Sequence, residues 1–438
     1  MGSSESKNFE EEIPWKDPIS VLIVGAGMRG QVYASYAKDF PTRMKVVGVA
    51  EPKRYRREMM RNLYKIEEKF VFEDWQPAAE REKFADAVVI ATMDYLHKDP
   101  CIAFAKKGYH ILLEKPMALN LSDCEQIVKV CKEQGIILAV GHVLRYRPHY
   151  LKVNDILESG KIGDIVSIQH MEPVGWYHFA HSYVRGNWRR QEDSGFSLLA
   201  KCCHDIDLIN SFMKDARCVA VSSFGALNHF TKSQKPNGAG ERCLDCAVET
   251  NCPYSAVKIY LEPTKHGVPN GFCFSVADKP TPETIEENLR KGPYGRCVYE
   301  CDNDVISNQV VNMMFEGGKT VSMSMVAFTE KLCVRQTKIF GTKGELICDE
   351  DSPITVYDFT TRKKETFECD TMPSETTTMS GHGFADYHLM HAFVKSVTFN
   401  DPSFILSSPD ECLESHRLVF LSEQSRVENR VINIQKSF

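Results

Sequence analysis

The stretch VLIVGAGMRGQVY, residues 21–33, decides the fold of this chain. Four apolar residues run into a glycine-rich turn, and the pattern after the turn is helical, so the sequence predicts a buried strand that passes directly into a helix. Gly25 allows the sharp turn, Gly27 lets a ligand approach the backbone, and Gly30 lets the helix pack closely on the strand. The N-terminus of such a helix favours a phosphate group.

An acidic residue follows the second predicted strand. Glu51 lies 21 positions after Gly30, close to the separation expected for a carboxylate that binds the ribose of a dinucleotide. A carboxylate about 4 Å from a 2′-phosphate would cost on the order of 4 kcal/mol at an effective dielectric near 20. Basic residues within 53–57 leave a phosphate-binding alternative open. The sequence therefore predicts NAD, with NADP as the weaker candidate.

The remaining chain divides into two predicted domains. From about residue 19 to 140, short apolar strands alternate with helices, which is typical of a parallel sheet covered on both faces. After residue 145, strands joined by glycine turns predict an antiparallel sheet. We therefore expect an α/β protein with a flexible N-terminal arm at 1–17, a Rossmann domain at 18–143, and a C-terminal α/β domain at 144–438 that has a large, mostly antiparallel open sheet and a cysteine-rich irregular insertion at 228–300.

Three helices are predicted with specific ends. Ser122 and Glu125 have the spacing of a capping box, and Ser408 and Glu411 have the same spacing around Pro409. The segment GFSLLAKCCHDIDLINSFM, at 195–213, is predicted as one continuous helix. Its polar stripe suggests that it forms the wall of a cleft.

Charge and hydropathy exclude several classes of protein. The formal net charge is −6 and the pI is about 6.2, so no basic face for nucleic acid is expected. The sequence has no apolar window that fits a membrane span and no secretory signal, so we expect a cytoplasmic protein. The start MGSSES matches an N-myristoylation signal at Gly2. One such chain gives only weak membrane association.

Cysteines concentrate in the irregular insertion. Three of the sixteen, Cys243, Cys246 and Cys252, fall within ten residues. Thiolates at this spacing suit a structural zinc ion once a fourth ligand is added, and a metal would stabilise a segment without periodicity. Cys297 or Cys301 supplies the fourth ligand in this hypothesis, and Cys273 is a weaker alternative. The alternative is a set of reduced cysteines without metal.

The segment ILLEKPMALN, at 111–120, introduces a family resemblance. Together with GAGMRG, VIATMDYLH, GHVLRYRPHY, SGKIGDI, GNWRR, HDIDL, FGTKGEL and GHGFAD, in this order, it resembles the glucose–fructose oxidoreductase, inositol dehydrogenase and rhizopine-catabolism (Gfo/Idh/MocA) superfamily over nearly the whole chain after residue 18. The resemblance implies a nicotinamide cofactor, hydride transfer at a sugar, cyclitol or glycoside carbon, and a homodimer or homotetramer that uses the open sheet.

The resemblance also implies catalytic residues. An ammonium at Lys115 would stabilise the alkoxide that develops as a secondary alcohol is oxidised, and His204 matches the acid/base histidine of the family. Inositol dehydrogenase-like members have Asp four residues before that histidine, where this chain has Ala200. The proton relay must therefore differ, with Lys201 or Asp205 as candidates, and either Lys115 or His204 remains the candidate general base.

Binding residues follow from the same motifs. Aromatic faces with arginine and histidine donors suit a polyhydroxylated ring, and His181 and Tyr146 are further candidates near the cleft. The alternatives to a dehydrogenase are an NAD-dependent glycoside hydrolase that oxidises its substrate transiently, and a non-catalytic regulator that binds NAD and a sugar. The expected cofactor-binding residues are Gly25, Gly27, Met28, Arg29, Gly30, Glu51, Thr92, His97, Glu114, Lys115 and Arg145, and the expected substrate-binding residues are Tyr177, His178, Trp188, Arg189 and His382.

Overall fold

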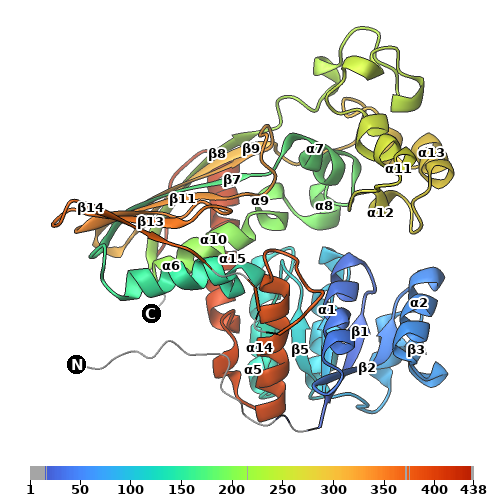
Figure 1. Ribbon diagram of the computed structural model, residues 1–438, viewed down its shortest axis with the longest axis horizontal. Helices are drawn as coiled ribbons and strands as arrows, with labels where there is room; N and C mark the ends of the chain where they lie inside the picture. Colours follow the sequence, from blue (N-terminus) through green and yellow to red (C-terminus); the bar gives the residue numbers. More distant parts are fainter. Residues whose placement is uncertain (1–14, 16, 215, 370–371, 374, 436–438) are drawn as a thin grey trace.

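The computed structural model describes residues 15, 17–214, 216–369, 372–373 and 375–435. The expected N-terminal arm and its Gly2 lie outside the described residues, apart from residues 15 and 17. Figure 1 shows a Rossmann domain beside a second domain built on a broad sheet, with the insertion projecting from one end of that sheet. Within the described residues, no helix has both the length and the apolar character needed to cross a bilayer.

The first domain is the predicted parallel sheet. Its six strands lie in the order β3-β2-β1-β4-β5-β6, and every pair is parallel. The order reverses beside β1, which is where doubly wound sheets bind their ligands. The elements are β1 (Ile19–Val24), α1 (Met28–Asp39), β2 (Met44–Ala50), α2 (Arg54–Tyr64), β3 (Val71–Phe72), α3 (Trp75–Glu80), β4 (Ala87–Ile90), α4 (Lys98–Lys106), β5 (His110–Leu113), α5 (Leu121–Glu133) and β6 (Leu138–Val140).

The second domain contains a nine-stranded sheet in the order β14-β13-β12-β11-β7-β10-β9-β8-β15. Only β7 and β10 are parallel neighbours, so the prediction of a mostly antiparallel sheet is confirmed. The predicted glycine turns join β9 to β10 and β11 to β12. The strands are β7 (Ile165–Pro173), β8 (Cys218–Ala226), β9 (Asn308–Phe315), β10 (Thr320–Val326), β11 (Gln336–Gly341), β12 (Gly344–Ile347), β13 (Ile354–Asp358), β14 (Lys363–Phe367) and β15 (Ile432–Asn433).

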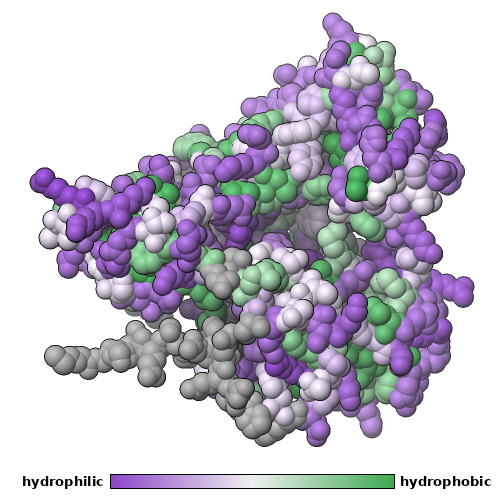
Figure 2. Space-filling model, viewed as in Figure 1, coloured by the Kyte–Doolittle hydropathy of each residue, from purple (hydrophilic) through white to green (hydrophobic). Residues whose placement is uncertain are grey.

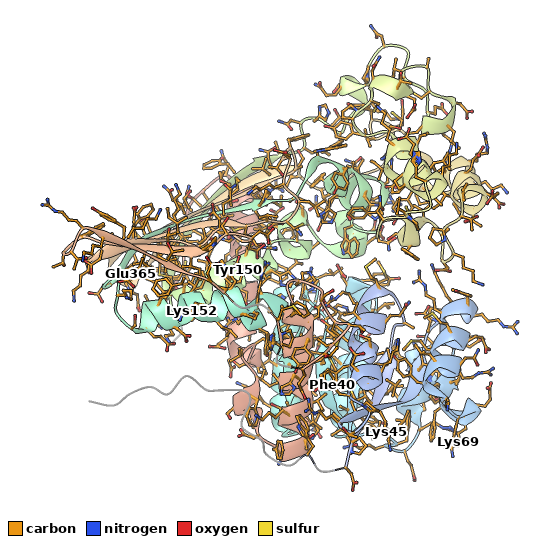
Figure 3. The ribbon with its side chains drawn as sticks, in the orientation of Figure 1. Phe40, Lys45, Lys69, Tyr150, Lys152 and Glu365 are labelled. Atoms are coloured by element: carbon orange, nitrogen blue, oxygen red, sulfur yellow. The ribbon has the colours of Figure 1, made fainter. Side chains whose placement is uncertain are left out.

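Helices cover one face of this sheet. Tyr150, labelled in Figure 3, lies on α6 (Pro148–Glu158) and is fully buried in the core between the helices and the strands. The helices α10 (Cys203–Phe212) and α15 (Pro409–Glu428) contribute to the same core. Along β9 buried and exposed residues alternate, so the other face of the sheet is open.

One helix near the C-terminus belongs to the core of the first domain. The side chains of α14 (Ala385–Phe399) pack against α1, and Tyr387 lies 5.6 Å from the ring of Phe40. Figure 1 shows α14 beside the Rossmann sheet rather than under the large sheet. The chain therefore returns to the first domain at α14, within the range 144–438 that the sequence analysis assigned wholly to the second domain.

Three helix predictions are wrong in detail. Asn120, not Ser122, caps α5, and its side chain accepts a hydrogen bond from the N–H of Asp123. Ser408 precedes α15 as predicted, but its hydroxyl donates to Glu411 and does not cap the backbone. The segment 195–213 breaks into α9 (Ser197–Ala200) and α10, because the chain leaves helical geometry between them.

The insertion is ordered and has a small core of its own. Short helices run through the segment that was predicted to be irregular. They are α11 (Glu262–Lys265), α12 (Cys273–Val276) and α13 (Pro282–Lys291), and they pack near α7 (Trp176–Phe179), the π-helix η4 (Ala180–Arg185) and α8 (Gln191–Ser194) of the second domain.

Candidate active site

The glycine turn leaves room for a ligand at one position. Gly25 has φ of +90°, and a Cβ there would lie 2.4 Å from a neighbouring carbonyl oxygen. A Cβ on Gly30 would lie 1.9 Å from the oxygen of Gly25, so neither position accepts a side chain. A Cβ on Gly27 would meet nothing closer than Arg56 Nη1, at 3.8 Å. The backbone at Gly27 therefore faces open space, as a bound diphosphate requires.

The first turn of α1 suits an anion. The helix begins at Met28 with no side-chain cap and no acidic residue in its first turn. Its first N–H groups are therefore available to a phosphate. Met28 itself is 59% exposed at the edge of the turn, and Thr92, just after β4, borders Gly25 through its backbone N.

Glu51 is held at the mouth of this turn. One carboxylate oxygen accepts from the N–H of Ala26 at 2.7 Å, and the other accepts from the N–H of Lys53 at 2.9 Å. The side chain is buried. Each oxygen keeps a free lone pair, so the carboxylate can still accept a hydroxyl.

The insertion reaches the first domain beside Glu51. Arg56 donates from Nε and Nη2 to Asp278 of the insertion, at 3.0 and 2.9 Å. Lys279 Nζ lies 5.3 Å from the ring centroid of Tyr55. The insertion therefore borders the end of the turn where a dinucleotide's adenosine would lie, and it engages one of the basic side chains predicted as an alternative phosphate ligand.

Arg29 has a structural role in this structure. Its Nε donates to Glu114 at 2.6 Å, and its Nη2 donates to Tyr33 at 2.7 Å and to Asp386 at 2.8 Å. Burial alone would raise the pKa of Glu114, but the charges of Arg29 and Lys115 outweigh it and lower that pKa. Arg29 and Glu114 thus tie α1, β5 and α14 together beneath the predicted cofactor site.

Lys115 bridges the two domains. It follows β5 at the carboxyl edge of the parallel sheet, and its Nζ donates to the carbonyl oxygen of Ala200 at 2.7 Å. Asp94, in η2 (Asp94–Leu96), accepts from Trp188 Nε1 at 2.9 Å. Burial raises the pKa of Asp94, although the charges of His97 and Lys115 oppose the shift. Figure 2 shows the molecular surface recessed between the two domains.

His204 begins a line of buried side chains. Its Nδ1 has no hydrogen-bond partner in the described part of the chain. The ring lies edge to face with His142, with centroids 5.6 Å apart, and His142 Nδ1 lies 3.9 Å from Asp207 Oδ2. Burial lowers the pKa of both histidines, so both are neutral at pH 7. The ring of His142 also has no hydrogen-bond partner among the described residues, so no hydrogen bond joins the two imidazoles directly.

Arg145 anchors the end of that line. Its Nε and Nη2 donate to the two oxygens of Asp207, at 2.7 and 2.9 Å. The expected cofactor-binding role of Arg145 is not supported, because its guanidinium is buried and committed to this pair. Ligand atoms of His142, Asp207 and Cys412 lie within 4.8 Å of one another. A metal ion there is disfavoured, since Arg145 already neutralises the carboxylate.

Lys201 and Asp205 face the large sheet. Lys201 lies at the break between α9 and α10, and Asp205 follows His204 on α10. Asp205 accepts from Arg335 Nε at 2.8 Å and lies 3.0 Å from His170 Nε2. Lys201 Nζ lies 3.2 Å from a carboxylate oxygen of Glu172. These ion pairs hold α9 and α10 against β7, so neither residue takes the place of the missing aspartate.

Two residues of the aromatic segment lie near the candidate site. Trp188 reaches Asp94, and His178 Nδ1 lies 3.3 Å from Cys333 Sγ. Burial lowers the pKa of His178 well below its usual range, and the charges of Lys201 and Lys115 contribute to the shift. His178 is therefore a neutral group within electrostatic range of Lys115.

Other residues of that segment pack the insertion instead of lining the site. Their rings and charged groups are already paired, so their predicted contact with substrate has no support in this structure. Tyr177 packs against Phe272 at 5.7 Å, His181 stacks on Tyr294 at 4.8 Å, and Arg189 donates to Asp302 at 2.9 Å.

The remaining predicted residues support the site from behind or lie at its rim. His97 is buried, and its Nδ1 lies 2.7 Å from the carbonyl oxygen of Pro116, so it positions the loop that carries Lys115. His382 Nδ1 lies 3.2 Å from Asp386 Oδ2 in a partly exposed position. Tyr146 bonds to Ser407 inside the core.

Three side chains of the site were not predicted individually. Asp94, His142 and Asp386 lie inside the motifs VIATMDYLH, GHVLRYRPHY and GHGFAD. The motifs marked the segments, but one sequence does not distinguish a buried carboxylate or imidazole from a solvated one.

Four of the five cysteines expected to bind zinc line the same cavity, and the fifth does not. Cys243, Cys246, Cys252 and Cys297 line one cavity of about 160 Å³. Cys301 does not line it, and its thiol donates to the carbonyl oxygen of Cys297. Of the two residues expected at the fourth position, Cys297 lines this cavity and Cys301 does not.

Comparisons with known proteins agree with the two-domain fold. A family model described as "Oxidoreductase family, NAD-binding Rossmann fold" matches residues 19–142. A second, described as "Oxidoreductase family, C-terminal alpha/beta domain", matches residues 155–434. An oxidoreductase from Agrobacterium radiobacter, solved in complex with NAD+, L-tartaric acid and magnesium, superimposes with a TM-score of 0.66 over 95% of this chain and 98% of that one, at 15% identity.

Curated relatives match over shorter lengths. The 2,7-anhydro-N-acetylneuraminate hydratase of Escherichia coli is 31% identical over 147 residues, which are 34% of this chain and 38% of the hydratase. The scyllo-inositol 2-dehydrogenase (NAD(+)) of Bacillus subtilis is 26% identical over 209 residues, 48% of this chain and 58% of the dehydrogenase. With both domains matched in order, the chain belongs to the Gfo/Idh/MocA oxidoreductase family, with an NAD-binding Rossmann domain followed by the family's C-terminal α/β domain.

Proposed function

We propose that this protein is an NAD-dependent oxidoreductase that acts on a hydroxyl carbon of a sugar, cyclitol or glycoside. The observation that carries the proposal is the hydrogen bond from Lys115 Nζ to Ala200. It brings the ammonium at the edge of the dinucleotide-binding sheet to the segment that carries His204. The scyllo-inositol dehydrogenase relative supports a polyhydroxylated ring as substrate.

Separate residues would bind the cofactor, stabilise the substrate oxygen and accept the proton. The turn at Gly27 and the first N–H groups of α1 would hold the diphosphate, and Glu51 would accept the ribose hydroxyls. When bound, NAD supplies the acceptor for the hydride. Lys115 stabilises the negative charge that develops on the substrate oxygen. His204 accepts the proton in its neutral form, and His142 would receive it in turn through a bridging water, because Asp207 favours a protonated imidazole beside it.

NAD is favoured over NADP in this proposal. The carboxylate of Glu51 is fixed by two backbone N–H groups, so it cannot withdraw readily from a 2′-phosphate. Arg56 is paired with Asp278, and Arg57 is buried against the backbone of Glu51. Titration of the protein with NADH and NADPH tests this preference, and tighter binding of NADPH would contradict it.

Steady-state assays separate the dehydrogenase from its alternatives. The purified full-length protein is incubated with NAD and a panel of sugars, cyclitols and glycosides while NADH absorbance is recorded. A dehydrogenase accumulates NADH in proportion to product. A second candidate, favoured by the hydratase relative, is an enzyme that oxidises its substrate transiently, and it would convert a glycoside or anhydro sugar with no net NADH. Binding of NAD and sugar without turnover would indicate a regulator.

The open face of the large sheet is proposed as the oligomer interface. Phe224 on β8 lies opposite Val310 on β9, and Met314 lies on the same face; the three are 58%, 39% and 45% exposed. Contiguous apolar area of this kind favours burial by a second copy. Light scattering would show a homodimer or homotetramer that Phe224→Glu dissociates, whereas a monomeric wild type would refute the interface.

Two further expectations remain proposals. One is a cytoplasmic protein with N-myristoylation at Gly2. Mass spectrometry of the native N-terminus tests the modification, and a free or acetylated Gly2 would refute it.

The cysteine cavity is proposed to hold a structural metal. Zinc, the ion expected from the sequence, requires sulfur atoms about 3.8 Å apart for four bonds of about 2.3 Å.

A further inference from the structure

The guanidinium of Arg56 lies beside the glycine turn. Arg56 is in the first turn of α2, the helix that follows Glu51. Among the described atoms, Arg56 Nη1 is the nearest to a Cβ built on Gly27, at 3.8 Å. The space over Gly27 is where the diphosphate of a dinucleotide is expected. A full positive charge therefore borders the position at which two negative charges would bind.

Two other arginines close to the turn are committed to contacts within the protein. Arg29, in the first turn of α1, donates to two carboxylates. Arg57 is buried, and its guanidinium donates to the carbonyl oxygen of Glu51. Arg56 differs from both, because one of its nitrogens is directed at the turn itself.

The insertion holds Arg56 in this position. Nε and Nη2 of Arg56 both donate to Oδ1 of Asp278, at 3.0 and 2.9 Å, so this pairing does not use Nη1. The two side chains are 22% and 35% exposed, so solvent screens the pair only in part. Beside it, Lys279 Nζ lies 5.3 Å from the ring centroid of Tyr55. Both contacts join the insertion to the start of α2.

The fold of the insertion determines where Asp278 lies. Asp278 follows α12, and Val276 at the end of that helix belongs to the same apolar core as Ile285 and Leu289 of α13. The N–H of Ala277 donates to the carbonyl oxygen at the start of α12, which closes the helix just before Asp278. Figure 1 shows α12 on the side of the insertion that faces the first domain.

We propose that Arg56 binds the diphosphate of the dinucleotide through Nη1 and that Asp278 positions it, so that the insertion completes the cofactor site. This inference rests on the proposed NAD-binding function and adds to it a side-chain ligand and a second contributing domain. Hydrogen bonds from a guanidinium to phosphate oxygens are charge-assisted and stronger than neutral ones. A side chain already held by Asp278 also loses less conformational freedom when the ligand binds.

Binding titrations of the full-length protein test the role of Arg56 without turnover. The ligands are NADH, followed by fluorescence, and ADP and adenosine, followed by calorimetry. Arg56→Ala should bind NADH and ADP at least about tenfold more weakly, whereas its affinity for adenosine, which lacks phosphate, should change less than about twofold. Arg61→Ala, on the same helix and paired with Glu58 and Glu68, is the matched control and should keep the wild-type affinities.

Two variants of Asp278 separate position from charge. Asp278→Asn and Asp278→Ala remove the same negative charge, but only asparagine keeps an oxygen that can accept from Arg56. Asp278→Ala should therefore bind NADH at least about threefold more weakly than Asp278→Asn. The difference should disappear when Arg56→Ala is added to both, because the effect passes through Arg56. Equal NADH affinity of the two single variants would overturn the positioning role.

The outcomes distinguish this inference from the proposed function. If the wild type binds neither NADH nor ADP, the proposed function itself fails. If the wild type binds NADH and Arg56→Ala binds it equally well, only the inference fails. The inference also fails if Arg56→Ala loses as much affinity for adenosine as for ADP, since that result would indicate a deformed site. Should Arg56→Ala not fold, the comparison of Asp278→Asn with Asp278→Ala still decides it.

Discussion

The ammonium of Lys115 donates a hydrogen bond to the carbonyl oxygen of Ala200, 2.7 Å away. Ala200 occupies the position at which inositol dehydrogenase-like members of the family have an aspartate. The backbone of one domain therefore orients the ammonium that the other domain carries. Neither Lys201 nor Asp205 replaces this aspartate as a partner of His204, because Lys201 forms an ion pair with Glu172 and Asp205 forms one with Arg335. His142 and Asp207 instead stand behind His204.

Replacing Lys115 should abolish most turnover but spare the cofactor. Lys115→Ala removes the positive charge that stabilises the developing alkoxide, so kcat should fall at least ~100-fold. The affinity for NADH should change less than about threefold, since the diphosphate and ribose contacts come from the glycine turn and Glu51. The measurements are steady-state kinetics and NADH fluorescence. Lys106→Ala, on the exposed side of α4, is the matched control and should keep full activity; undiminished turnover in Lys115→Ala would place the chemistry elsewhere.

Two glycines of one turn should behave in opposite ways. Gly27→Ala adds a Cβ with no atom nearer than 3.8 Å, so the protein should fold with an unchanged melting temperature, yet lose at least about tenfold in NADH affinity because the methyl group occupies the ligand's space. Gly30→Ala places its Cβ 1.9 Å from a carbonyl oxygen, and should destabilise the fold by several kcal/mol. Thermal melts and NADH titrations check both. Full NADH affinity in Gly27→Ala would show that no dinucleotide crosses this turn.

His142 should affect the pH dependence more than the binding of cofactor. His142→Gln removes the imidazole between His204 and Asp207, so kcat should fall about tenfold, less than for a group that contacts the substrate directly. Burial lowers the pKa of His204, and the acid limb of the wild-type profile should therefore lie below about pH 6.5. In the variant this limb should shift. A fall in kcat of equal size at every pH, with no shift, would indicate a purely structural role.

Sequence reasoning predicted the features that depend on local pattern. The turn at Gly25, Gly27 and Gly30 has one backbone solution between a buried strand and a helix, and the strand–helix alternation predicted that the first sheet is parallel. The hairpin at 317–318 followed from glycines that adopt positive φ. In each case the residues that encode the feature are neighbours in the chain.

Features that depend on contacts between distant residues were missed. The helix predicted at 195–213 breaks after α9, where Lys201 turns toward Glu172 on β7. Arg145 was assigned to the cofactor because nothing local reveals its partner Asp207, 62 residues later. The return of α14 to the first domain likewise depends on apolar contacts with α1 that no local pattern records.

Buried neutral histidines should make the fold sensitive to mild acid. Burial lowers the pKa of His416 to about 3 in the folded protein, against about 6.5 in the unfolded chain. Between these values the unfolded chain binds a proton that the folded protein excludes, so stability should rise with pH, by at most about 1.4 kcal/mol per pH unit for this group, and level off above about pH 6.5. His416→Gln keeps an acceptor for the N–H of Met117 and should lower the slope by that amount between about pH 5 and about pH 6, where most carboxylates are already ionised. Urea unfolding at each pH measures the slope. His266→Gln, at an exposed position, should leave it unchanged, and an equal slope in wild type and His416→Gln would mean that His416 is protonated in the folded protein.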